Sequence, residues 1–169
     1  MDYGMIGQIA KAKHYAEERH RMKFLSFSAQ MVGDNNTHTV TYTGEGHWHC
    51  TSDFFNQHGW SSHTRALEQI LKDMVTPIPA VTGKPPASQS SMIGQIDKSR
   101  KYLTEPQRVK FLNFVVTFNG DNHTHTVKYD GSAWSCTCHF FETHKWCSHV
   151  IAVERILSGM VQAPEKASV

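Results

Sequence analysis

The chain repeats itself, and this internal repeat constrains the fold more than any other feature of the sequence. The segment MIGQIAKAKHYAEERHRMKFLSF, which begins at Met5, matches MIGQIDKSRKYLTEPQRVKFLNF, which begins at Met92. The segment GDNNTHTVTYTGEGHW from Gly33 likewise matches GDNHTHTVKYDGSAW from Gly120, with one extra residue in the first. Self-similarity of this length indicates one structural unit built twice, so one assignment of elements must serve both copies.

The repeat divides the chain into two copies and a connection. We predict a first copy over residues 1–75, a linker over 76–91, a second copy over 92–160 and a tail over 161–169. The linker, TPIPAVTGKPPASQSS, holds four of the six prolines of the chain, a composition typical of an extended connection. A unit of about 70 residues is small for independent folding, so each copy would benefit from a cross-link.

Each copy is expected to fold in the order α–β–β–(β)–α, which places the chain in the α+β class with a small antiparallel sheet in each repeat. The first segments, residues 6–22 and 93–104, have sparse apolar residues among charges and predict surface helices. The next segments, KFLSFSAQM and KFLNFVVTF, alternate with a period of two and predict half-buried strands. The buried faces expected from this alternation are Leu25, Phe27, Ala29 and Met31 in one strand and Leu112, Phe114, Val116 and Phe118 in the other.

Three of the four cysteines lie between residues 136 and 147, in a pattern suited to a metal. Cys136-x-Cys138 is followed by eight residues and then by Cys147-x-His149. Three thiolates and one imidazole fill the tetrahedral shell of Zn²⁺ and leave no position open for a substrate, so a catalytic zinc is not favoured. We expect the first pair after the last strand and the second pair at the start of the final helix, where one ion would join hairpin to helix.

Two other chemistries explain the same residues less well. A redox Cys-x-Cys pair would leave Cys147 and His149 without a role. A catalytic Cys–His pair would need an oriented base and an oxyanion pocket, and the sequence indicates neither. A structural zinc site is therefore the preferred interpretation.

The spacing C-x-C-x8-C-x-H, after a hairpin and before a helix, resembles the SWIM zinc finger. The resemblance covers residues 125–157, and the repeat extends it to the matching part of the first copy. It implies a ββα frame, one structural zinc held by Cys136, Cys138, Cys147 and His149, and a role in binding DNA or proteins. Members of this family usually accompany a larger catalytic domain, and we expect none within this sequence.

The first copy has lost two of the four ligands. Its equivalent positions are Cys50, Ser52, Ser61 and His63, and hydroxyls are poor zinc ligands. We therefore expect one zinc ion in the chain, with a metal-free first copy that packs on the second as a pseudo-two-fold partner. In an alternative, His47 or His49 joins Cys50, His58 and His63 around a second ion.

Other histidines and aromatic residues surround the expected knuckle. His139 and His144 are expected to face solvent, although His144, matched by His58, could support the knuckle through a hydrogen bond. The aromatic residues that recur in both copies are expected to pack beside the site: Phe140, Phe141 and Trp146 in one, and Phe54, Phe55 and Trp60 in the other.

Positive charge is concentrated at the start of each copy. The chain has a net charge of only +2, but residues 4–24 and 94–111 each hold five basic and two acidic residues. These two segments could lie along a phosphate backbone. The candidate nucleic-acid-binding residues are Lys11, Lys13, Arg19, Arg21, Lys23, Lys98, Arg100, Lys101, Arg108 and Lys110.

These features favour a non-enzymatic, zinc-stabilised module that binds DNA or RNA. The alternative is a protein adaptor within a larger protein or nucleoprotein assembly, which would dock on the mixed second faces of the two long strands. Those faces comprise Phe24, Ser26, Ser28 and Gln30 in one copy and Phe111, Asn113, Val115 and Thr117 in the other. We expect no small-molecule substrate and no membrane partner, and the absence of an apolar export signal predicts a soluble cytoplasmic protein.

Overall fold

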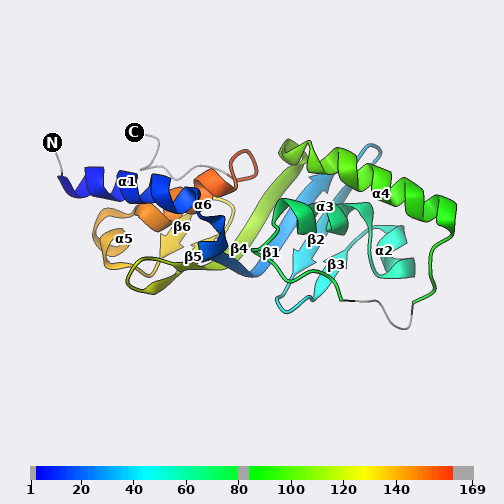
Figure 1. The fold of residues 1–169 in the computed structure, drawn as a ribbon, viewed down its shortest axis with the longest axis horizontal. Helices are drawn as coiled ribbons and strands as arrows, with labels where there is room; N and C mark the ends of the chain where they lie inside the picture. The colour runs from blue at the N-terminus through cyan, green and yellow to red at the C-terminus, as the bar shows by residue number, and fades with distance from the viewer. Residues whose placement is uncertain (1–2, 80–83, 162–169) are drawn as a thin grey trace.

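The computed structural model describes residues 3–79 and 84–161, whose strands form one antiparallel sheet in the order β3-β2-β1-β4-β5-β6 (Figure 1). We call residues 3–79 the first half and residues 84–161 the second half. Each half contributes its first strand to the centre of the sheet and its third strand to an edge. The strands are β1 (Met22–Val32), β2 (Thr37–Tyr42), β3 (Trp48–Cys50), β4 (Val109–Asn119), β5 (Thr124–Tyr129) and β6 (Trp134–Cys136).

Each half contributes three helices, and none of the described helices is both long and apolar enough to cross a bilayer. They are α1 (Tyr3–Ala16), α2 (Asp53–His58), α3 (Ser62–Ile70), α4 (Gln89–Leu103), α5 (His139–His144) and α6 (Ser148–Ile156). The short helices α2 and α5 were not expected from the sequence. Helix α1 ends at Ala16 instead of Met22, because a 3₁₀ turn over Arg19–Arg21 leads the chain into β1. Helix α4 begins at Gln89, inside the segment predicted as linker.

The expectation of a separate small sheet in each copy is wrong. Strands β1 and β4 pair antiparallel along nearly their whole length, from Met22 opposite Phe118 to Met31 opposite Val109. This pairing satisfies the two edges that separate sheets would leave open. Across the junction Phe24 stacks on Phe111, with ring centroids 5.6 Å apart, so the two halves share one core.

A bulge in each long strand overturns part of the predicted burial pattern. The pairing shifts register at Leu25 and again at Leu112, so each leucine has no partner across the junction. Both leucines are exposed, by 48% and 37%, although the alternation had placed them in the core. Phe24 and Phe111, expected on the outer faces, are buried instead.

All buried strand residues lie on one face of the sheet, beneath the helices. The other face, which we call the open face, consists of exposed or partly exposed side chains, mostly hydroxyls and amides. Such one-sided burial is common in antiparallel sheets. The open face is made of Lys23, Ser26, Ser28, Gln30, Val32, Thr37, Thr39, Thr41, His49, Lys110, Asn113, Val115, Thr117, Asn119, Thr124, Thr126, Lys128 and Ser135, with the bulged Leu25 and Leu112.

The first helix of each half packs on the other half. Helix α1 lies along α6, and α4 lies along α3, as the two ends of the molecule show in Figure 1. Ala12 and Tyr15 of α1 are buried in this contact, as are Ser99 and Tyr102 of α4. The two halves are therefore joined both through the sheet and by exchanged helices.

Candidate metal centre

The four predicted zinc ligands converge at one corner of the second half. Cys136 is the last residue of β6, Cys138 caps the N-terminus of α5, and Cys147 caps α6, with His149 in the first turn of that helix. Their ligand atoms all lie within 4.8 Å of one another. Among residues 3–79 and 84–161, they form the only group of three or more such side chains that could hold a metal ion.

Two of the thiols sit at helix N-termini. The backbone N–H of Phe141 donates to Cys138 Sγ, and that of Val150 donates to Cys147 Sγ, both at 3.4 Å. Donors and the helix dipole at these positions favour thiolate over thiol. The local fold thus directs backbone donors at two of the sulfur atoms that would bind a cation.

Without a cation the three thiols cannot all ionise. Hydrogen bonds from its neighbours, Cys136 first, lower the pKa of Cys138. The bond to Cys138 raises the pKa of Cys136 to about 12, and the bond to Cys136 raises the pKa of Cys147. A divalent cation removes this conflict because a coordinating thiol is deprotonated outright. The donor set therefore fits Zn²⁺, which here would be structural.

The imidazole of His149 is held on several sides. Its Nδ1 lies 3.8 Å from Cys136 Sγ, and its ring contacts the rings of Tyr15 and Phe118. On the opposite side, a Cβ added to Gly120 would lie 3.1 Å from His149 Nε2. Glycine at this turn therefore allows the histidine to stay close to the thiols.

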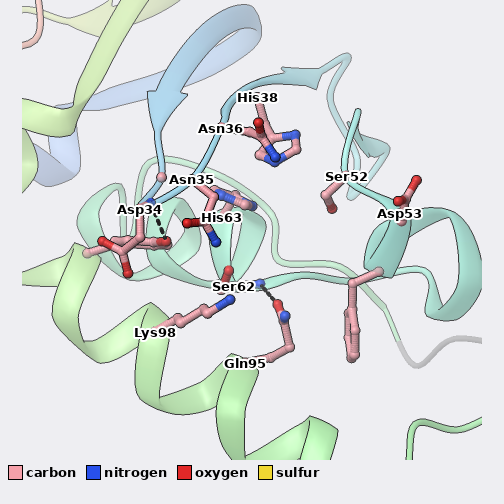
Figure 2. Close-up of a pocket in the computed structure, with 13 residues that line it drawn as sticks. Asp34, Asn35, Asn36, His38, Ser52, Asp53, Ser62, His63, Gln95 and Lys98 are labelled. Carbon is pink, nitrogen blue, oxygen red and sulfur yellow. Dashed lines mark hydrogen bonds between the residues drawn. The ribbon is translucent and has the colours of Figure 1, made fainter.

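The matching corner of the first half has the same frame, with serine in place of two of the three cysteines. Ser52 caps α2 and Ser61 caps α3, and their Oγ atoms accept from Phe55 N and Thr64 N, each at 3.2 Å. Cys50 Sγ lies 3.4 Å from Ser52 Oγ and 4.0 Å from His63 Nδ1. The corner borders a polar cavity of about 210 Å³, shown with Ser52 and His63 in Figure 2.

The structure does not assemble the alternative metal site in the first half. His47 Nδ1 contacts Gly44 O, and His58 Nδ1 contacts Pro85 O at 2.7 Å, so each ring is held by a carbonyl outside the corner. His49 is exposed on the open face. Burial lowers the pKa of His63 to about 4, with smaller effects from His38 and Lys98, so its ring is neutral at pH 7.

The remaining histidine and aromatic residues discussed around the zinc site are either exposed or packed against neighbouring side chains. His139 and His144 are exposed, as expected. His144 stacks on Phe140 and contacts the hydroxyl of Thr143, and both of these residues belong to α5. Trp146 is buried against Ala12 and Ile151, which confirms packing for this aromatic residue.

The basic residues predicted to contact nucleic acid divide into three groups. Carboxylates neutralise some of them: Arg21 pairs with Glu18 and Asp121, while Arg108 and Lys101 share Asp34. Backbone carbonyl oxygens accept hydrogen bonds from Arg19, Lys23 and Lys110. Arg100 lies 3.9 Å from Asp97, whereas Lys11, Lys13 and Lys98 make no ion pair with any described residue.

Sequence reasoning missed residues from α1 that surround the metal centre. Gln8, Lys11 and Tyr15 line the same cavity as Cys138 and His149. Gln8 and Tyr15 recur as Gln95 and Tyr102 in the second copy, which is a signal of a shared role. The sequence could not show that each set serves the opposite half.

Comparison with protein families finds a match to the SWIM zinc finger over residues 114–157. The match runs from the middle of β4 to the residue after α6, and it includes all four converging ligands. No significant match is found among curated proteins or among solved structures. Residues 114–157 are therefore similar to the SWIM zinc finger, and the cysteine and histidine side chains that converge there support one structural zinc ion.

Proposed function

We propose that the chain is a duplicated, non-enzymatic binding module that is stabilised by zinc and binds nucleic acid on its open face. The matching order of elements in the two halves and the symmetric strand order support duplication. A filled Cys₃His shell supports a structural ion over a catalytic one. The zinc then holds the second half of the sheet in shape, and the sheet carries the binding surface.

The charge of the strands is the observation that carries this proposal. The six strands contain three lysines, Lys23, Lys110 and Lys128, and no aspartate or glutamate. All three lysines are exposed, and the side chains between them are mostly hydroxyls and amides. A cationic face with many neutral hydrogen-bond donors suits phosphate contacts that do not depend on base sequence.

The predicted residues of the helices contribute less to this surface. Lys11, Lys13, Lys98 and Arg100 lie on α1 and α4, which pack on α6 and α3, the helices that contact the strands. Arg21, Lys101 and Arg108 already face carboxylates. We therefore assign the phosphate contacts to the strands, and Lys13, Lys98 and Arg100, exposed on the helices, provide a matched comparison.

The test compares two triple variants for binding to duplex DNA and to single-stranded DNA and RNA over a range of salt. Three phosphate contacts predict a slope of about −3 for log affinity against log salt on duplex DNA. Lys23→Gln/Lys110→Gln/Lys128→Gln should abolish most of this dependence, whereas Lys13→Gln/Lys98→Gln/Arg100→Gln should retain it. Wild-type protein that shows no salt-sensitive binding would refute nucleic-acid binding, and a loss only in the helix variant would refute the assigned face.

Exposed apolar residues favour a protein partner as the second candidate. Ile6 and Ile9 of α1 are 45% and 44% exposed, and Ile93 of α4 is 52% exposed, within the MIGQI segments that both copies share. Such side chains commonly contact other proteins. In a pull-down from native extract, partners that survive nuclease treatment and disappear with Ile6→Ser/Ile93→Ser would support the adaptor function instead.

A further inference from the structure

Helix α1 belongs to the first half but presents three side chains to the zinc centre of the second half. These are Gln8, Lys11 and Tyr15, which follow the spacing of one helical face. All three line the cavity of about 120 Å³ that borders Cys138 and His149. None of them is a metal ligand, so any effect on the ion acts through the residues that they touch.

Gln8 fixes the segment that carries two of the ligands. Its Oε1 accepts a hydrogen bond of 2.8 Å from the backbone N–H of Ser148. Ser148 lies between Cys147 and His149 at the start of α6. The amide of Gln8 therefore satisfies one of the unpaired donors of this helix end and holds the turn between the two ligands in place.

Tyr15 fixes the orientation of the histidine ligand. Its ring stacks on the ring of His149, with centroids 5.7 Å apart and planes inclined by 15°. Its hydroxyl accepts a hydrogen bond of 3.2 Å from Asp121 N, which follows the Gly120 turn beside His149 Nε2. Tyr15 thus supports both the imidazole and the turn against which the imidazole rests.

Lys11 supplies positive charge beside the centre. A Zn²⁺ ion with three thiolates and a neutral imidazole keeps one uncompensated negative charge. Lys11 has no ion pair among the described residues and lines the same cavity as Cys138. The helix therefore adds an electrostatic contribution to its two positioning contacts.

We propose that α1 is a positioning element for the zinc site, so that zinc binding in the second half and docking of α1 from the first half are coupled. The coupling is reciprocal: α1 raises the affinity for zinc, and zinc holds α1 against α6. The ion thereby stabilises the exchange of helices between the halves as well as the finger itself.

The first half contains a matched control for every one of these contacts. Gln95 of α4 accepts from Ser62 N at 2.8 Å, as Figure 2 shows, and Lys98 lines the cavity there. Tyr102 stacks on His63 with centroids 5.5 Å apart, and its hydroxyl accepts from Asp34 N at 3.4 Å. The same packing is therefore present next to a corner that lacks two of the three thiols.

The first experiment measures zinc affinity of the full chain by competition with a coloured chelator. Gln8→Ala and Tyr15→Leu should each weaken binding by about tenfold to a hundredfold, as for other residues that support metal ligands. Gln95→Ala and Tyr102→Leu should change the affinity by less than about threefold, although they remove the same contacts. Equal losses in both pairs, or wild-type affinity in the first pair, would overturn the proposal.

The second experiment needs no variant and therefore does not depend on the folding of mutants. Hydrogen exchange of the wild-type chain is compared with zinc and after removal of zinc by chelator. Backbone amides of α1 should lose protection when zinc is removed, while those of α4 should keep theirs. An unchanged α1, or equal loss in α1 and α4, would contradict the coupling.

Discussion

The corner of Cys136, Cys138, Cys147 and His149 and the corner of Cys50, Ser52, Ser61 and His63 share a frame but differ in chemistry. In the second half, sulfur caps the helices at N···S distances of 3.4 Å; in the first, oxygen caps them at N···O distances of 3.2 Å. Capping therefore does not need the metal, because serine is among the best N-cap residues. The thiols instead supply negative charge and soft ligand atoms, which stabilise the corner only when a cation binds them.

The first half also shows how the fold tolerates the loss. Ser61 forms a capping box with Thr64, a reciprocal bond that Val150 at the equivalent position cannot make. Strand β1 gains long pairing from β4, and α4 covers α3. Hydrogen bonds and shared packing thus stabilise a corner that the second half secures with an ion.

Cys147→Ser should give the largest effect of any single change. The substitution gives the second-half corner the residue that the first half has at the equivalent position, Ser61. It keeps an N-cap on α6 and removes one zinc ligand. Since structural zinc contributes folding free energy directly, we expect loss of the ion and a decrease of more than about 4 kcal/mol in the free energy of unfolding. Denaturant unfolding and zinc content measure this, and a variant with wild-type values of both would contradict the role of the ion.

The reverse exchange should create a second zinc site. Ser52→Cys/Ser61→Cys gives the first half the ligand set of the second on the same frame. We expect two zinc ions per chain and a rise of several kcal/mol in the stability of zinc-loaded protein. The visible spectrum of the cobalt-substituted variant would show whether both sites are tetrahedral; a single site would mean that the corners differ in more than their thiols.

The buried His63 should make the first half sensitive to acid. Its pKa is lowered from 6.5 to about 4 by burial, so the folded state favours the neutral ring. Its contribution is complete above pH 6.5 and is lost as the pH falls toward 4, by about 3 kcal/mol in total. The free energies of unfolding of wild type and His63→Gln should converge over this range, because only the wild type loses this contribution. Zinc loss affects both proteins equally and therefore does not alter their difference. Parallel pH profiles would contradict the burial effect.

Ser61→Ala should give the smallest effect. It removes the cap of α3 and leaves Thr64 N without its acceptor, at a cost of about 1–2 kcal/mol in unfolding free energy. Zinc content should stay at the wild-type value, because no ligand is changed. Thermal unfolding with parallel metal analysis measures both quantities, and loss of zinc would show that the two corners are not independent.

Local patterns allowed much of the site to be predicted from the sequence. Cys136-x-Cys138 and Cys147-x-His149 are short motifs, and each remains adjacent in space whatever the rest of the chain does. The expected position at the start of the final helix is confirmed for Cys147 and His149, whereas Cys136 ends the last strand and only Cys138 follows it. The exchange of helices could not be predicted, because Gln8 would fit Ser62 or Ser148 equally well and only the tertiary connection selects one.

The joined sheet and its bulges escaped prediction for a similar reason. Alternation in KFLSFSAQM assigns Leu25 to the core, but pairing between β1 and β4 inserts an extra residue and buries Phe24 instead. A bulge depends on the partner strand, and the sequence did not identify that partner. Tertiary pairing therefore overrode the local period at these positions.

The number of zinc ions bound to the wild-type chain tests the central claim most directly. Elemental analysis of protein purified without added metal, referred to an accurate protein concentration, should give one ion for each chain. That ion should remain in Ser61→Ala and be absent in Cys147→Ser. Two ions for each wild-type chain, or none, would contradict the distinction between the two corners.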